Sequence, residues 1–331
     1  MKLQKLHIKN FKSIVDLEIV EPNPFTVFVG PNGSGKSNVF EALEFLLGES
    51  AAKVRLFGGI ENLKHRNTES DTYYFRLDSE ASSLEEKISY YDDTFPISLL
   101  VAAGTNSKVL TGESLASYGE YFDSRRKFNF LRLFVNNVSK QKINYGDDMK
   151  LNFSASNLEK VLKRILQDEV KREEIKEWLD LFIPGFENIE IVSSELSGTD
   201  TLVMYEKGIK KPFTKDLLSD GTYNILALLT AVYQSDEPQF LCIEEPENGL
   251  NPYVVRALAE FFRLMCADKG HYIWLNTHSQ SLVSELREEE MILVDKIEGE
   301  TKIRQFKKGD FYGLRADEAW LTNALGGGLP W

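Results

Sequence analysis

The sequence predicts an α/β fold built on a buried parallel sheet. Residues 25–29 are apolar throughout (FTVFV), and a glycine-rich turn and a helical stretch follow at once. A strand without polar positions is typical of a sheet that is covered on both faces. Two further apolar runs end in polar sequences: residues 240–243 run into EEPE, and residues 272–275 run into NTHS. Ligands of α/β sheets gather where the strands end, so these polar groups are candidate site residues.

The N-terminal region is expected to form an antiparallel β lobe, because apolar residues alternate over 2–8 and 14–20. The next hundred residues are less regular. They contain candidate strands at residues 72–77, 87–91, 95–101 and 130–138. Apolar residues at helical spacing then predict an amphipathic helix pair over residues 158–166 and 175–183.

Regular α/β patterning returns from residue 186 onward. Strands are expected at residues 189–192, 201–205, 240–243, 272–275 and 291–294, and helices at residues 223–233 and 253–265. The chain is therefore divided into an N-terminal half of residues 1–50, a mixed insertion lobe of residues 51–185 and a C-terminal half of residues 186–331. No heptad array is present, which excludes a long coiled-coil arm between the halves.

Composition narrows the class of protein. The 39 basic and 51 acidic residues give a net charge of −12, which argues against a protein that mainly coats nucleic acid. Cys242 and Cys266 lie in apolar segments and are expected to be reduced core residues. The sequence contains no signal-peptide pattern and no apolar run of spanning length. A cytoplasmic protein without a membrane partner is expected.

Residues 30–37 (GPNGSGKS) match the phosphate-binding pattern G-x-x-x-x-G-K-[ST] in full. The glycines let backbone N–H groups turn toward the phosphates, and the following helix adds the positive end of its dipole. Lys36 is expected to reach the β- and γ-phosphates, and the Ser37 hydroxyl to bind Mg²⁺. The residues expected to contact the nucleotide in this loop are Asn32, Gly33, Ser34, Gly35, Lys36, Ser37 and Asn38.

A phosphate loop needs an acid for the metal and a base for water. The strand at residues 240–243 delivers two carboxylates to its end, Glu244 and Glu245. Glu244 is expected to hold Mg²⁺ through its water shell, and Glu245 to polarise the attacking water. Charges at strand ends are commonplace, so an ordinary acidic loop is the alternative for this motif taken alone.

Two weaker motifs follow the same order along the chain. The sequence LSDGT at residues 218–222 precedes a helix and, by itself, reads as a helix N-cap with a turn glycine. His278 follows the strand at residues 272–275 and, by itself, could be a satisfied core or cap histidine. The order and spacing of LSDGT and His278 relative to the phosphate loop favour a role in the nucleotide site over a purely structural one.

Together these motifs resemble ATPases of the ABC superfamily, and in detail AAA-type ATPases related to the RecF, SMC and OLD families. LHIKNFKSI at residues 6–14, LSDGT, and EEPENGLNP at residues 244–252 carry the resemblance, which covers residues 1–48 and 155–296. It implies a P-loop NTPase of the ABC/SMC-head type that binds and hydrolyses ATP with Mg²⁺. Residues 1–50 and 186–331 would be the two halves of that ATPase.

The resemblance also implies roles for single residues. Ser219 and Gly221 would contact the γ-phosphate held by a second subunit, so that ATP is sandwiched in a head-to-tail homodimer. Isolated chains are therefore expected to hydrolyse ATP slowly. His278 would be the switch histidine, which completes a catalytic set with Lys36 and Glu245.

The sequence departs from the pattern of these relatives at two places. Glu244 stands where Asp is usual, and Asn251 stands where His is common before Pro252. A glutamine loop is expected in the middle segment, where Asn136, Asn137 and Gln141 are all weak candidates.

In the tail, residues 312–321 form a short amphipathic stretch, expected to fold back on the ATPase core or to dock a partner.

Three functions are consistent with these patterns. The first is an ATP-dependent dimeric switch that controls a separately encoded effector, such as a nuclease or toxin of a bacterial anti-phage or toxin module, or that acts in DNA maintenance. The second is a non-enzymatic, ATP-bound scaffold that holds an effector inactive. The third, a transporter ATPase subunit, is disfavoured by LSDGT and the RecF-like start. DNA is a further candidate partner through lysine clusters at residues 2–12 and 207–215, although such clusters are more often solvated faces.

Overall fold

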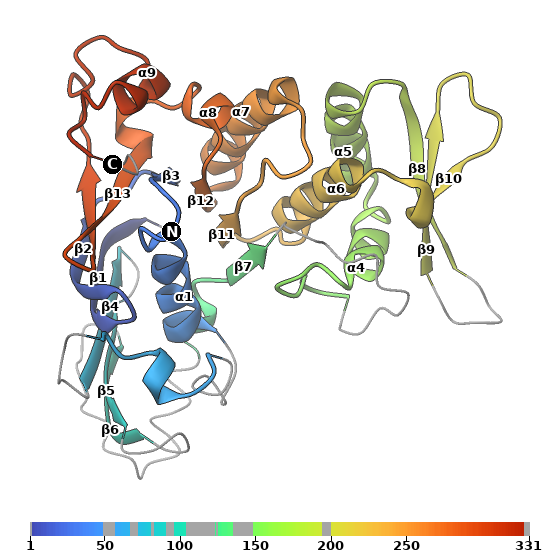
Figure 1. The fold of residues 1–331 in the computed structure, drawn as a ribbon. Coiled ribbons are helices and arrows are strands. Elements are labelled where there is room, and N and C mark those ends of the chain that lie inside the picture. The colour runs from blue at the N-terminus through green and yellow to red at the C-terminus, as the bar shows by residue number, and fades with distance from the viewer. Residues whose placement is uncertain are drawn as a thin grey trace.

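The computed structural model describes residues 2–48, 57–66, 72–80, 83–90, 96–103, 123, 125–134, 148–193 and 200–327. These residues form three sheets with helices between them (Figure 1). A five-stranded sheet and a three-stranded sheet lie at opposite ends of the molecule, and the central six-stranded sheet lies between them.

The central sheet has the strand order β14-β13-β3-β12-β11-β7. All neighbouring strands from β13 to β7 are parallel, and β14 adds an antiparallel edge. The strand bounds are β3 Phe25–Val29, β7 Phe130–Phe134, β11 Phe240–Glu244, β12 Tyr272–Thr277, β13 Met291–Ile297 and β14 Glu300–Gln305. The predicted α/β class and its three apolar central strands are therefore confirmed.

The central strands are apolar at successive positions because both faces of the sheet are covered. Phe25, Val27 and Val29 of β3 belong to one core, with helices α4 to α7. Phe28 of the same strand and Trp274 of β12 belong to a second core, with α1 and the N-terminal sheet. The helix bounds are α1 Lys36–Leu47, α4 Leu158–Ile165, α5 Glu169–Phe182, α6 Asp220–Tyr233 and α7 Pro252–Lys269.

The five-stranded antiparallel sheet has the order β2-β1-β4-β5-β6. Its strands are β1 Leu3–Phe11, β2 Ile14–Val20, β4 Thr72–Ser79, β5 Ser83–Tyr90 and β6 Pro96–Ala103. The N-terminal hairpin is as predicted, and β4 pairs directly with β1, so the middle segment extends the N-terminal lobe. The expected insertion lobe of residues 51–185 thus supplies strands to two sheets, because β7 joins the central one. The division into three domains remains a prediction.

The three-stranded sheet β10-β9-β8 comprises β8 Phe186–Ser193, β9 Asp200–Glu206 and β10 Phe213–Thr214. Short helices complete the described chain: 3₁₀ turns η1 Ile60–Asn62, η2 Lys215–Leu217 and η3 Glu288–Glu290, with α8 Gln280–Val283 and α9 Ala316–Leu321. Ala316, Ala319 and Trp320 of α9 are buried in the main core. The expected tail helix therefore folds back on the body of the protein, and the final residues 328–331 lie outside the described residues.

Polar residues mark several helix starts. Asn251 caps α7: its Oδ1 accepts a hydrogen bond from the backbone N of Val254 at 3.1 Å, and Pro252 occupies the first turn. Ser219 caps α6 in the same way, accepting from Thr222 N at 3.0 Å. Asn251, which stands where relatives commonly have His, thus serves as the N-cap of α7. The LSDGT motif also forms a helix N-cap, as its sequence alone indicated.

Candidate active site

The phosphate-binding loop connects β3 to α1 and passes close to other backbone segments. Gly35 adopts φ +102°, a conformation that favours glycine, and a Cβ there would lie 1.9 Å from Thr301 Oγ1. A Cβ on Gly30 would lie 2.0 Å from the carbonyl oxygen of Val294. The two glycines therefore permit the loop to approach β13 and β14, which are remote in sequence.

Lys36 is folded back over its own loop. Its Nζ donates to the carbonyl oxygens of Gly30 at 2.7 Å and of Pro31 at 2.9 Å. Burial lowers the pKa of Lys36 to about 8, against the opposing effect of Glu245 and Glu247. Among the described residues, the hydrogen bonds of this ammonium group go to neutral carbonyls, so it can exchange them for anionic phosphate oxygens.

Ser37 and Glu244 meet although they lie 207 positions apart in the sequence. The Ser37 hydroxyl donates to Glu244 Oε2 at 3.0 Å. Asn276, at the end of β12, donates to Ser37 Oγ at 3.3 Å and approaches Glu244 Oε2 at 3.5 Å. Because β3, β12 and β11 are adjacent parallel strands, their carboxyl ends bring these three side chains together.

Glu245 occupies an unusual backbone conformation at this edge, with φ +46°. Its backbone N–H donates to Asn276 O at 3.0 Å and to Asn276 Oδ1 at 3.1 Å. Its Oε2 accepts from Asn248 Nδ2 at 2.8 Å, and its Oε1 lies 3.9 Å from His278 Nε2. Both side chains remain about one-third exposed, so solvent reaches the pair.

His278 is positioned by Glu247, a residue that the sequence prediction did not single out. Glu247 Oε1 accepts from Thr277 Oγ1 at 2.5 Å and from the backbone N of His278 at 3.1 Å. Burial raises the pKa of Glu247, opposed by these hydrogen bonds. Burial, followed by the charge of Lys36, lowers the pKa of His278.

Ser219 and Gly221 form a separate group. Ser219 is exposed, whereas Gly221 is buried against the loop that follows β11, where a Cβ would lie 2.3 Å from Gly249 O. Among the described residues, no hydrogen bond or ion pair joins either residue to residues 30–38. The structure therefore brings together Lys36, Ser37, Glu244, Glu245 and His278, and Gly221 of the LSDGT motif contacts the loop after β11 instead.

Arg132 is a site neighbour that the sequence prediction missed. It lies on β7, opposite Cys242 of β11, and its guanidinium contacts Glu244. Burial lowers its pKa, but the carboxylates of Glu244 and Glu44 raise it more, so that the net shift is upward. The available signal was a single charge in the apolar run FLRLF. The glutamine-loop candidates Asn136, Asn137 and Gln141 follow this strand and lie outside the described residues.

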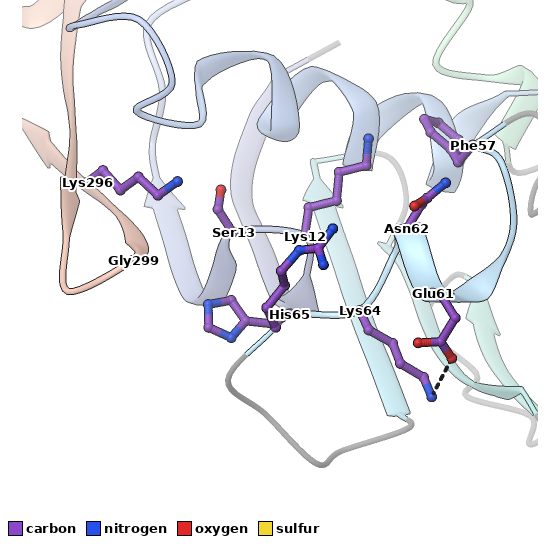
Figure 2. A pocket seen from close by; sticks show the side chains of 10 residues that line it. Lys12, Ser13, Phe57, Glu61, Asn62, Lys64, His65, Lys296 and Gly299 are labelled. Carbon is purple, nitrogen blue, oxygen red and sulfur yellow. Dashed lines mark ion pairs between the residues drawn. The ribbon is translucent and has the colours of Figure 1, made fainter.

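A basic pocket of about 550 Å³ adjoins the phosphate loop. Figure 2 shows Lys12, Lys64 and Lys296 around it, together with Ser13 at the turn between β1 and β2. Ser13 Oγ accepts from Asn38 Nδ2 at 2.5 Å and lies 2.5 Å from Thr301 Oγ1. Asn38 immediately follows Ser37, so this pocket is connected to the phosphate loop by direct contacts.

Comparison with known families agrees with this geometry. The model of the family described as "AAA domain, putative AbiEii toxin, Type IV TA system" matches residues 25–284. The chain belongs to this AAA-domain family. The matched region extends from β3 to the end of α8 and thus contains the phosphate loop, the EEPE motif and His278. The predicted AAA-type ATPase identity is therefore confirmed at the level of the domain.

Individual relatives of this AAA-domain protein differ in the extent of the match. It is 22% identical to an ATP/GTP phosphatase of Helicobacter pylori over 94% of both chains. It is 53% identical to a chromosome partition protein Smc of Methanocaldococcus jannaschii over 15% of this chain, which spans only 4% of that relative's length.

Solved structures confirm the predicted SMC-head-like fold. An Smc head bound to the C-winged helix domain of ScpA superposes with a TM-score of 0.68 and 17% identity, covering 92% of this chain and 98% of that chain. An Smc head of Pyrococcus furiosus, bound to the C-terminal domain of ScpA, gives a TM-score of 0.66 at 14% identity over 98% of each. Within the described residues, no helix has the length and apolarity needed to cross a membrane.

Proposed function

We propose that this AAA-domain protein is an ATP-driven dimeric switch that controls a separately encoded effector. The contact between Ser37 and Glu244 carries the proposal, because it joins a phosphate loop to an acidic strand end at the carboxyl edge of one parallel sheet. That arrangement is the one needed to hold a nucleotide and its metal ion.

The Ser37 hydroxyl and the Glu244 carboxylate fit Mg²⁺, which prefers oxygen ligands and is usually held by few protein groups together with substrate phosphates. Bound there, Mg²⁺ would neutralise phosphate charge. Lys36 would leave the carbonyls of Gly30 and Pro31 for phosphate oxygens. The buried Ser34 Oγ, for which the described residues provide no hydrogen-bond partner, offers a further polar contact in the loop.

Glu245 and His278 would act on the water that attacks the γ-phosphate. The Asn248 amide holds one oxygen of the Glu245 carboxylate, and the other oxygen faces the His278 ring across 3.9 Å. A carboxylate that is held in this way and remains accessible to solvent can accept a proton from water. His278 is then positioned to contact the same phosphate group, as the family resemblance implies.

The basic pocket would receive the part of the nucleotide beyond the phosphate loop. Its connection through Ser13 and Asn38 places it next to Ser37. Ribose and base carry no charge, so the lysines of the pocket would act on the phosphates held by the neighbouring loop. The lining combines charged and polar side chains with the ring of Phe57, which agrees with a ligand that is partly apolar.

Exposed residues support a dimer that is closed by ATP. Ser219 is exposed at the N-terminus of α6, where backbone N–H groups favour an anion. Leu217 and Tyr253 are 67% and 65% exposed beside this motif and at the start of α7. Apolar side chains in such positions are suited to an interface. A second subunit could therefore complete each nucleotide site with its LSDGT motif.

The identity of the effector is proposed from the relatives alone. The family description names a putative toxin of a toxin–antitoxin system, and the structural neighbours are heads of chromosome partition proteins that were solved with a ScpA domain. The Smc heads support a switch that acts on a separate partner chain. The family description supports a toxin module as its setting. DNA is a weaker candidate, since Lys2, Lys5 and Lys9 pair with nearby carboxylates.

The test is the mass of the purified protein in solution with and without Mg-ATP, for wild type and Glu245→Gln. The substitution removes the proposed base while preserving the size of the side chain. We expect turnover to fall by about 100-fold and the ATP-bound dimer to accumulate. Co-expression with the products of neighbouring genes then identifies a partner that co-purifies with the trapped dimer.

Other outcomes decide against the switch. A Glu245→Gln protein that stays monomeric at saturating Mg-ATP contradicts the sandwich. The scaffold function is favoured if the protein binds ATP tightly, turns it over at the background rate, and has the same mass in solution with and without nucleotide. Glu289→Gln is a matched control, because it makes the same substitution on η3, away from the phosphate loop.

A further inference from the structure

Glu244 has a further partner besides Ser37 and Asn276, and that partner binds the other carboxylate oxygen. Arg132 Nε donates to Glu244 Oε1 at 2.6 Å, and one of its terminal nitrogens contacts the same oxygen. Oε2 is left to the Ser37 hydroxyl and the Asn276 amide. The two oxygens of one carboxylate are thus assigned to different partners.

Arg132 is itself held from several sides. Its other terminal nitrogen donates to Glu44 Oε2 at 2.6 Å, and Glu41 lies within 3.7 Å. Both of these acids are on α1, the helix that begins at Lys36. The guanidinium also lies 5.0 Å from the centre of the Phe153 ring, and the side chain is only 9% exposed. Arg132 therefore ties β7, the end of β11 and the phosphate-loop helix together.

We propose that Arg132 is a positioning residue that orients the Glu244 carboxylate for Mg-ATP. A glutamate has one more rotatable bond than an aspartate, so its carboxylate samples more positions. The planar guanidinium fork removes this freedom on the Oε1 side and leaves Oε2 beside Ser37. This contact explains how the longer glutamate can serve at a position where a shorter acid is usual.

The inference rests on the proposed binding of Mg-ATP, and the test separates the two. The test uses a fluorescent ATP analogue and measures the Mg²⁺ concentration for half-maximal binding by the full-length protein. Arg132→Lys keeps the charge but loses the fork. We expect this substitution to raise the half-maximal Mg²⁺ concentration about tenfold, the loss typical of groups that orient a metal ligand.

Arg263→Lys is the matched control. Arg263 is a partly buried arginine of α7 that donates from Nε to Glu290 Oε1 at 2.7 Å and stacks over Phe25, away from Ser37. Its substitution is expected to lower the thermal midpoint without changing the Mg²⁺ requirement. If Arg132→Lys behaves in the same way, Arg132 is only structural and the inference is wrong. A lower Mg²⁺ requirement also overturns it, because the guanidinium would then act mainly by repelling the cation.

A double-mutant cycle tests the pairing directly. Glu244→Asp shortens the acid and withdraws it from Arg132. If the arginine acts through Glu244, Arg132→Lys should change the Mg²⁺ requirement much less in the Glu244→Asp background than in wild type. Fully additive effects would contradict the inference. A wild-type protein that binds the analogue independently of Mg²⁺ would instead remove the proposed metal site, and the inference with it.

Discussion

Glu247 accepts a hydrogen bond from the backbone N–H of His278 at 3.1 Å, and so joins the loop after β11 to the loop after β12. The same oxygen accepts from Thr277 Oγ1 at 2.5 Å. Its other oxygen is buried without a partner among the described residues. Burying a carboxylate oxygen without a hydrogen-bond partner costs free energy. We infer that this cost is retained because Glu247 holds His278 in place relative to Glu245.

Replacing Glu247 by alanine should therefore slow ATP turnover more than it weakens ATP binding. The change leaves the Thr277 hydroxyl and the His278 backbone N–H without this acceptor, and we expect kcat to fall about tenfold, equivalent to about 1.4 kcal/mol. Glu247→Gln retains an oxygen acceptor and should keep most of the activity. Steady-state kinetics with equilibrium nucleotide binding separates the two effects, and a Glu247→Ala enzyme with wild-type kcat would show that His278 needs no such support.

Gly221 is expected to tolerate no side chain, because the start of α6 touches the loop after β11. A Cβ would lie 2.3 Å from Gly249 O, and that atom belongs to the backbone and cannot rotate away. Gly221→Ala should lower the free energy of unfolding by about 1–3 kcal/mol. It should also weaken the proposed ATP-dependent dimer, because it displaces Ser219.

Asp220→Ala provides the control for this prediction, since Asp220 is exposed in the same turn and its replacement adds no atom against Gly249. Chemical denaturation and solution mass measure the two effects. Equal stability of Gly221→Ala and Asp220→Ala would mean that the loop moves aside at little cost.

The basic pocket leads to a charge-reversal prediction. Lys296 is exposed at the rim, at the end of β13, and lines the pocket. Lys296→Glu should raise the dissociation constant for ATP about fivefold, close to 1 kcal/mol, without changing stability. Lys302→Glu changes the net charge equally on β14, at a residue that is not part of the pocket lining. The pocket assignment fails if both variants bind ATP alike.

The parts of the fold that could be predicted are those that are determined by the residues of one contiguous segment. The apolar runs of β3, β11 and β12 are readable because both faces of the sheet are buried. Strand β14 was missed, since its sequence ETKIRQ is polar and it becomes a strand only by pairing with β13 at an edge. The pairing of β4 with β1 was likewise not readable, because strand pairing across 60 residues leaves no local pattern.

The residues of the candidate site likewise fall into those that contiguous motifs predict and those that only the folded structure reveals. The phosphate loop and the EEPE motif carry their chemistry in contiguous residues, so the sequence alone identified them. Arg132 and Glu247 contact partners that are distant in the chain, namely Glu244 at 112 positions and Thr277 at 30. Only the packing of β7, β11 and β12 side by side reveals these contacts.

Lys36 makes ATP binding pH-dependent in a defined direction. In the nucleotide-free protein, burial lowers its pKa to about 8, and bound phosphates would raise that pKa by supplying negative charge. The complex then holds more protons than the free protein above pH 8, so affinity should fall as the pH rises through that value. Calorimetry at pH 8.5 in two buffers of different ionisation enthalpy should detect an uptake of about half a proton or more, shrinking toward pH 7. Ser37→Ala, which leaves the lysine in place, should retain the uptake. Binding at pH 8.5 without proton uptake would show that Lys36 stays on the carbonyls of Gly30 and Pro31 and that phosphate is held by the backbone alone.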